Sequence, residues 1–393
     1  LLAIAVLLST DRKAIKLRTV GIAVLLQVSI AAQIIYVPYG RDALQSVVNG
    51  VQHVINYGND GIEFVFGTQA KQSLGFTIAL NVLPVIVFFS ALMSVLYYLG
   101  IMQRVVGFFG GGLRKLLGTS ETESMSAVSN VFVGHTEAPL VVKPYLATVS
   151  NSELFAIMTG GCATIAGAVM AAYASMGVDL KFLITASFMA APGGLLIAKL
   201  MMPETSESTG TFDAELAAED RPVNIFEAIG NGAATGLTLA LNVGAMLLAF
   251  VAMIALLNGM LGGIGGWFGF EDLSLQLVLG QLFAPIAFLV GVPWEEAVTA
   301  GGLIGQKFVI NEFYAYANFV QIKDTLSDQT QVIITFALCG FSNLASIAIL
   351  MGGLGSIIPS RRRDIARLGL RAVIGGTLAN LMSASLAGIF FSL

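Results

Sequence analysis

Two acidic residues, Glu137 and Glu312, lie in unexpected places in the sequence, because apolar segments flank both of them. The first is in "GHTEAPL", next to His135 and Thr136, and the second is in "INEFYAY". An ionisable side chain at membrane depth is rare and usually marks a binding or transport site. A carboxylate accepts hydrogen bonds from hydroxyl groups, and histidine and threonine add both donors and acceptors. This set of side chains could therefore bind a small polar solute.

The composition indicates an integral membrane protein. Of the 393 residues, 56% are hydrophobic and 11% are charged, and the mean hydropathy is +0.83. Soluble domains carry roughly 25% charged residues. The sequence has no basic cluster that would favour nucleic-acid binding. Its two cysteines lie within apolar segments and its two histidines are far apart, so neither a disulfide framework nor a zinc site is predicted.

A membrane span needs about 20 apolar residues, and the sequence predicts one all-helical membrane domain. Residues 228–270 are too long for one span, and glycine-rich ends favour one helix near 236–258, flanked by irregular or interfacial pieces. Residues 41–71 predict an interfacial amphipathic helix plus a loop, and 203–224 a long cytoplasmic loop. We expect residues 1–10 to be the end of a membrane helix rather than a signal-peptide core. The predicted spans are 19–40, 72–103, 154–178, 182–198, 228–270, 273–294, 329–360 and 372–393.

Basic residues predict the orientation of these spans. The segments "DRKAIKLR" and "RRRDIARLGLR" and the loop with Arg104, Arg114 and Lys115 should be cytoplasmic. This holds if residues 121–152 form a hairpin that enters and leaves on the cytoplasmic face. It also requires that residues 273–322 make no net crossing.

The surroundings of Glu137 and Glu312 are similar, which predicts an internal repeat. Another acid precedes them by 14 and 16 residues, and a cysteine follows them by 25 and 27 residues, within an apolar segment rich in small and polar residues. Each unit therefore reads as a re-entrant hairpin, a broken helix and a further helix. Three crossings separate the hairpins, so the units should be inverted, as in many secondary transporters. Unwound backbone survives in a membrane only where it lines a cavity.

Several other residues favour structural roles. Glu123, Glu295 and Glu296 read as first-turn helix acids, and Gly232 and Gly236 have the spacing of a helix-packing face. Lys307, like Lys143, is expected to pair with another group or to extend towards the membrane surface.

The segments "GHTEAPLVVKPYL", "MTGGCATIAGAVMAAY", "GVPWEE", "INEFYAY" and "CGFSNLASIAI" strongly resemble the concentrative nucleoside transporters. The resemblance implies homotrimers in the lipid bilayer, with eight membrane helices, two re-entrant hairpins and interfacial helices in each protomer. It also implies an elevator mechanism, in which a transport part moves against a scaffold. The corresponding scaffold segments are approximately 1–40, 72–103 and 228–260. The transport segments are approximately 41–71, 104–202 and 273–393.

The same resemblance implies roles for individual residues. The nucleobase would contact His135, Thr136, Glu137 and Val169. The ribose would contact Glu312, Asn343 and Ser346, with Phe341 nearby. A sodium ion would be held by Asn130, the Val133 carbonyl, Thr164 and the Ile165 carbonyl. The sequence departs from the family at His135, where relatives commonly have glutamine, and this leaves the base preference open.

The function predicted from these observations is Na+-coupled uptake of nucleosides such as uridine or adenosine across the inner membrane, by a multi-pass symporter. Neutral oxygen ligands favour sodium, whereas the titratable His135, Glu137 and Glu312 keep proton coupling open. A channel is a weaker alternative. A membrane-embedded enzyme is disfavoured, because the sequence contains no nucleophile–His–Asp arrangement, HExxH motif or phosphate-binding loop.

Overall fold

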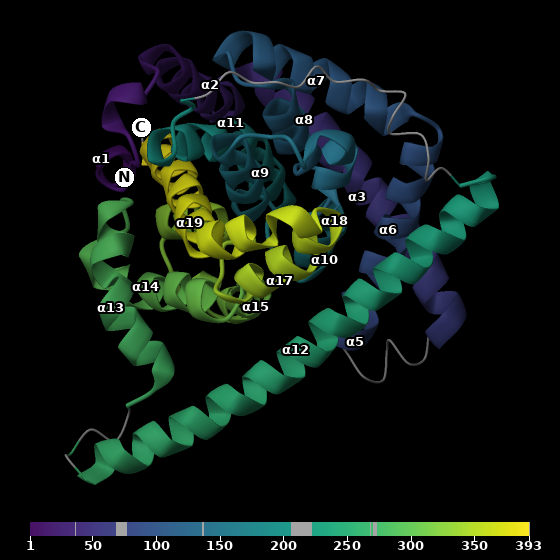
Figure 1. The fold of residues 1–393 in the computed structure, drawn as a ribbon. Coiled ribbons are helices and arrows are strands. Elements are labelled where there is room, and N and C mark those ends of the chain that lie inside the picture. Colours follow the sequence, from purple (N-terminus) through teal and green to yellow (C-terminus); the bar gives the residue numbers. More distant parts are fainter. Residues whose placement is uncertain are drawn as a thin grey trace.

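A computed structural model describes residues 1–35, 37–67, 77–135, 137–205, 222–267, 269 and 273–392 (Figure 1). Thr136 and residues 206–221, which form most of the predicted cytoplasmic loop, lie outside the described residues. So do residues 72–76, at the start of one predicted span.

The N-terminal part contains the helices that precede the first hairpin, and the last of them packs against it. Pro84 lies in the first turn of its helix, where its missing N–H costs nothing. Gly100 and Gly118 have φ of 73° and 67° and border the amphipathic helix between them. The elements are α1 (Leu2–Leu7), η1 (Arg12–Ala14), α2 (Leu17–Ile35), α3 (Pro38–Phe66), α5 (Ile78–Asn81), α6 (Leu83–Tyr98) and α7 (Ile101–Leu117).

The first repeat unit is a hairpin followed by a broken helix. Ser120 and Ser150 each form a capping box, with Glu123 and Glu153 respectively. Glu123 also forms an ion pair with Lys199, which joins the hairpin to a later helix. The elements are α8 (Glu121–Ser129), η2 (Ala138–Tyr145), α9 (Asn151–Ala163), α10 (Gly167–Ser175) and α11 (Leu180–Met201).

The second repeat unit has the same order of elements. The first two of its helices are bent by 114° relative to each other, with Gly291 at φ 106° between them. The last helix begins ten residues before the predicted span at 372. The elements are α13 (Leu275–Leu289), α14 (Trp294–Val309), α15 (Glu312–Ile322), η4 (Lys323–Thr325), α16 (Asp328–Leu338), α17 (Ala345–Gly352), α18 (Leu354–Ile357), η5 (Pro359–Arg361) and α19 (Arg362–Ser392).

Helix α12 (Ile225–Trp267) connects the two units as one continuous helix of 43 residues. The prediction of a helix near 236–258 with irregular flanks was therefore wrong in extent. A glycine lowers the stability of a helix by only about 1 kcal/mol relative to alanine. Two of the glycines in α12 also contribute to packing. Carbon atoms placed on Gly232 and Gly236 would lie 2.7 Å from the backbone of α6. Small residues allow this close approach. Further along α12 (Figure 1), the Asn258 side chain hydrogen-bonds Gln276 and the Leu275 amide.

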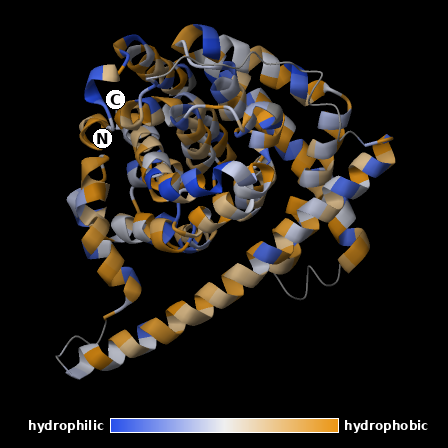
Figure 2. Ribbon diagram, viewed as in Figure 1, coloured by the Kyte–Doolittle hydropathy of each residue, from blue (hydrophilic) through white to orange (hydrophobic). Residues whose placement is uncertain are grey.

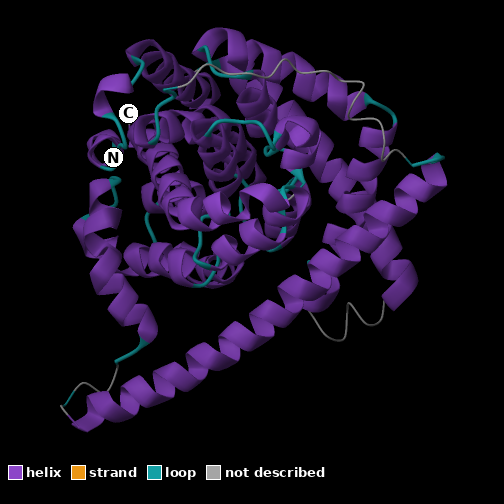
Figure 3. Cartoon of the chain, viewed as in Figure 1, coloured by secondary structure: helices purple, strands orange, loops and turns teal. Residues whose placement is uncertain are grey.

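Every described element is a helix (Figure 3), and the apolar residues are concentrated on helices such as α12 (Figure 2). Within the described ranges, five helices are long and apolar enough to cross a membrane, or six if α13 and α14 form one bent span. The count of eight membrane helices remains a prediction. The five are Ile78–Tyr98, Asn151–Ser175, Leu180–Met201, Ile225–Trp267 and Pro359–Ser392.

Candidate solute-binding site

In each unit the broken helix is hydrogen-bonded to the hairpin of the same unit. The Gly167 amide donates to the Phe132 carbonyl (2.9 Å), and the Leu344 amide donates to the Phe308 carbonyl (3.0 Å). In both cases an amide at the end of the break donates to a carbonyl that lies four or five residues before Glu137 or Glu312, the glutamates at the hairpin tips. The two units therefore share their local geometry as well as their order of elements.

The two helix breaks also contact each other. The Phe341 amide donates to the Thr164 carbonyl at 3.1 Å. The Asn380 side chain in α19 lies between the breaks, and its Nδ2 donates to the carbonyls of Ala163 (2.6 Å) and Cys339 (2.8 Å). Carbonyls at a helix end have no partner within the helix and must find one elsewhere. Asn380 supplies this partner to both broken helices and fixes them side by side.

Glu312 lies at the centre of a buried polar cluster at the second hairpin. Its Oε2 accepts from Nδ2 of Asn343 (3.0 Å), and its Oε1 accepts from the Tyr173 hydroxyl (3.1 Å). The Ser346 amide donates to Asn343 Oδ1 at 2.9 Å, and the Ser346 hydroxyl donates to the Phe341 carbonyl. The structure thus brings together the four residues that the family resemblance placed at the ribose. Sequence reasoning missed Tyr173, although a buried tyrosine hydroxyl usually requires a partner.

The tip of the first hairpin reaches the second break through His135. The rings of His135 and Phe341 are 4.9 Å apart at an interplanar angle of 61°. His135 is 8% exposed, and neither ring nitrogen has a hydrogen-bond partner among the described residues. Glu137 is half-buried, with the Gly134 amide 3.3 Å from its Oε2, and Val169 is buried in α10. The imidazole nitrogens are therefore free to bind a solute.

The residues predicted to hold sodium lie between the first hairpin and the first break. Asn130 donates to the Ser126 carbonyl (2.9 Å), while its buried Oδ1 has no partner among the described residues. The Thr164 hydroxyl donates to the Gly160 carbonyl at 3.1 Å, which leaves its oxygen free to accept. Neither the Val133 nor the Ile165 carbonyl accepts a backbone hydrogen bond from any described residue.

Their chemistry fits a monovalent cation. The side chains and the freed carbonyls are neutral oxygen donors of the kind that coordinate Na+ at broken helices. No group of three His, Cys, Asp or Glu side chains that could hold a metal occurs in the described part of the chain.

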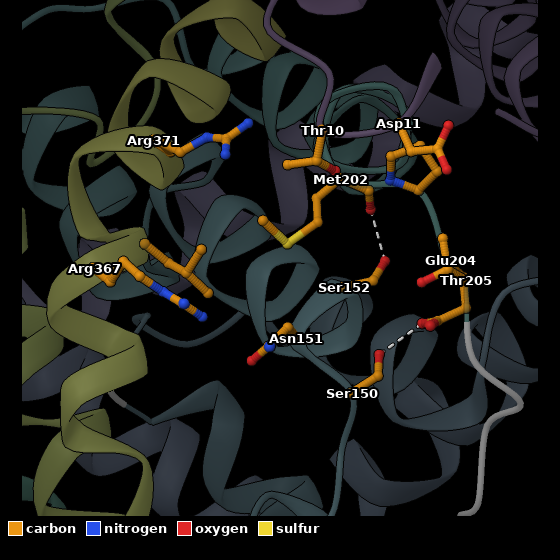
Figure 4. Close-up of a pocket in the computed structure, with 12 residues that line it drawn as sticks. Thr10, Asp11, Ser150, Asn151, Ser152, Met202, Glu204, Thr205, Arg367 and Arg371 are labelled. Carbon is orange, nitrogen blue, oxygen red and sulfur yellow. Dashed lines mark hydrogen bonds between the residues drawn. The ribbon is translucent and has the colours of Figure 1, made fainter. Parts of the chain in front are cut away.

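A separate cavity of about 580 Å³ lies where α9 begins and α11 ends (Figure 4). Ser150 donates to Glu204 and Ser152 to the Met202 carbonyl, both at 2.7 Å, while Arg367 and Arg371 line the opposite side. None of the described residues predicted to bind solute or sodium lines this cavity.

Comparison with known families identifies the chain. The sequence model described as "Na+ dependent nucleoside transporter C-terminus" matches residues 182–388, and the corresponding N-terminal model matches residues 1–69. A model described as "Nucleoside recognition" matches residues 79–180, which contain the first hairpin and the first break. The chain belongs to the Na+ dependent nucleoside transporter family.

Similar proteins include a nucleoside permease, NupC, from Helicobacter pylori. It is 51% identical, and the alignment covers 100% of this chain and 96% of the relative. An uncharacterized transporter from Haemophilus influenzae is 58% identical over the same shares of both chains. Sodium/nucleoside cotransporter 1 of the rat is 39% identical, over 98% of this chain and 61% of the relative.

Solved structures of the transporter CNTnw are also similar. The inward-facing, substrate-bound structure has a TM-score of 0.95 at 55% identity, and a variant in an outward-facing state has 0.96 at 56%. Each alignment covers 100% of this chain and 95% of CNTnw. The predicted family is confirmed, and the protein is a multi-pass, all-helical membrane transporter whose homologues are permeases rather than enzymes.

Proposed function

We propose that the protein is a secondary active symporter that couples inward movement of Na+ to nucleoside uptake across the inner membrane by alternating access. The observation that carries this proposal is the meeting of the two hairpins at one pair of helix breaks. His135 of the first hairpin contacts Phe341 of the second break. Glu312 of the second hairpin bonds Tyr173, which follows the first break. A solute held there would contact both halves of the repeat.

The nucleoside would lie with its ribose towards the second hairpin. Ribose hydroxyls are donors and acceptors, and the cluster of Glu312, Asn343 and Ser346 offers carboxylate, amide and hydroxyl groups. The base would lie beside Phe341 and the first hairpin. There it would contact Val169 and the side chains of His135, Thr136 and Glu137.

Sodium would bind to the Asn130 and Thr164 side chains and to the Val133 and Ile165 carbonyls. The free Oδ1 of Asn130 supports this assignment. Moving one cation down the membrane potential yields roughly 2.3 kcal/mol per 100 mV, which is enough to accumulate a neutral nucleoside roughly 50-fold before the sodium gradient is counted.

Uptake of labelled uridine into cells or proteoliposomes tests the coupling ion. With sodium replaced by choline at fixed pH, uptake should fall to the level of vesicles without the protein. Undiminished uptake in choline that depends on an inward proton gradient would replace sodium by protons. Counterflow of labelled uridine against an unlabelled excess would distinguish a carrier from a channel.

We also propose that one part of the protein moves against a fixed scaffold during transport. CNTnw has been solved in inward-facing, intermediate and outward-facing states, which supports alternating access in this relative. We assign residues 1–40, 72–103 and 228–260 to a scaffold that carries a homotrimer contact. Residues 41–71, 104–202 and 273–393 would form the moving part. The many exposed apolar residues of α12 suit contact with lipid or a neighbouring copy.

A further inference from the structure

Lys307 is a buried lysine of the second hairpin that lies outside the residues proposed to contact the solute or sodium. It lies in the last turn of α14 and is 2% exposed. Its Nζ donates to the Ala337 carbonyl and to Oδ1 of Asn380, both at 2.7 Å. In the described part of the chain, no carboxylate lies within 4.0 Å of this ammonium. A buried charge without a counter-ion is costly unless other groups stabilise it.

Neutral oxygens stabilise this ammonium. Ala337 lies in the last turn of α16, where the carbonyl end of the helix carries partial negative charge. Asn380 Oδ1, the second oxygen, also accepts from the Ser342 hydroxyl at 3.0 Å, while the amide nitrogen of Asn380 bonds the two breaks. A cation surrounded by carbonyl oxygens at the end of a broken helix is the arrangement by which such helices hold Na+.

The internal repeat relates this position to the proposed sodium site. Ala163 and Leu338, the last residues of α9 and α16, each follow their tip glutamate by 26 residues. The bonded carbonyls of Phe132 and Phe308 also correspond, because each meets the end of its own break. Lys307 precedes Phe308 by one residue, and Asn130 precedes Phe132 by two. Both side chains therefore arise from the same stretch of the hairpin.

We propose that the Lys307 ammonium occupies, in the second unit, the place that sodium takes in the first. The carrier then binds one mobile cation for each nucleoside and holds the second cation as a fixed side chain. This inference rests on the proposed Na+ symport. It also implies that removing the amine leaves an oxygen-lined position that a second Na+ can enter.

The test compares purified Lys307→Ser with Lys323→Ser. Lys323 also donates to a carbonyl, that of Gly177 at 2.9 Å, but at an exposed site. Uridine binding is titrated with NaCl at constant ionic strength, with choline chloride as the replacement. We expect the Hill coefficient for sodium to rise from about one to about two in Lys307→Ser only. Lys307→Arg, which keeps the charge, should remain near one.

Thermal melting provides a second readout. Lys307→Ser should melt lower than the wild type in choline and recover specifically in sodium. A folded Lys307→Ser protein would overturn the proposal if its Hill coefficient stayed near one and sodium did not specifically restore its melting temperature. Lys307 would then have only a structural role.

If the variants do not fold, the ratio of sodium to uridine transported by the wild-type protein tests the proposal instead. Fluxes of labelled sodium and uridine in proteoliposomes should have a ratio of about one, and a ratio of two would overturn the fixed-cation proposal. Uridine uptake by the wild type without any sodium flux would instead refute the proposed symport itself.

Discussion

The carboxylate of Glu312 is held at both oxygens, by Tyr173 and Asn343, so its orientation is set before a solute binds. Replacing it with glutamine keeps its size and removes the charge. Hydrogen bonds to charged groups contribute about 1.5–3 kcal/mol. We therefore expect Glu312→Gln to weaken uridine binding roughly 10- to 100-fold. Competition assays should show a much smaller loss for 2′,3′-dideoxyuridine, and equal losses would contradict the ribose assignment.

Asn130 and Thr164 can be tested through the ion that they are proposed to bind. Asn130→Ala and Thr164→Val each remove one neutral oxygen, which is worth about 1 kcal/mol. The sodium concentration for half-maximal uridine uptake should rise roughly 2- to 10-fold in each variant. The apparent uridine affinity at saturating sodium should change little. A uridine defect that persists at saturating sodium would indicate that these residues act on the nucleoside.

His135 has two buried ring nitrogens without partners among the described residues, and it contacts the Phe341 ring. Glutamine presents a donor and an acceptor in a different geometry and lacks the aromatic ring. We expect His135→Gln to shift the ratio of adenosine to uridine affinity by roughly 5- to 10-fold. The preference for uridine over its dideoxy analogue should be retained. An unchanged adenosine-to-uridine ratio would place His135 outside the base contact.

The packing of α12 on α6 depends on two glycines that have no room for a side chain. A carbon atom on Gly232 would lie 2.7 Å from Ala91 Cα, and one on Gly236 would lie 2.7 Å from Val87 Cα. Gly232→Leu and Gly236→Leu should each destabilise the protein by about 1–3 kcal/mol, because backbone must move. Thermal melting in detergent measures the loss. Gly230→Leu is the matched control, since among the described residues no atom outside its own helical turn lies within 4 Å of its added carbon. An equal loss there would point to helix propensity instead.

The whole molecule should respond to its two ligands together. A ligand that binds only the folded state stabilises it by about 2.7 kcal/mol at a concentration of 100 Kd. Uridine should therefore raise the melting temperature more in sodium than in choline, and sodium should raise it more when uridine is present, because the coupling is reciprocal. Uracil, which is the base of uridine without its ribose, serves as the control. Equal uridine shifts in both salts would argue against sodium coupling.

Local sequence signals predicted the repeat well. Glu137 and Glu312 marked both hairpin tips, and the small and polar residues beyond them marked both breaks. The extent of α12 was not predictable from its glycines alone, because the packing surface that accommodates two of them is on another helix. Asn380 and Tyr173 were missed for a similar reason. Their partners Ala163 and Glu312 are 217 and 139 residues away in the sequence, and no local pattern records such contacts.

The length of α12 determines how it must lie in a bilayer. Its 43 residues span about 65 Å at 1.5 Å per residue, whereas a membrane with its headgroups is about 40–45 Å thick. With both ends at headgroup level, the helix would tilt roughly 50° from the membrane normal, beyond the usual range of about 0–40°. At that slope, one further degree of lean changes the depth it spans by only about 1 Å. A small change in the tilt angle of α12 would therefore fit the helix to a thinner or thicker bilayer, and its ends would not need to unwind.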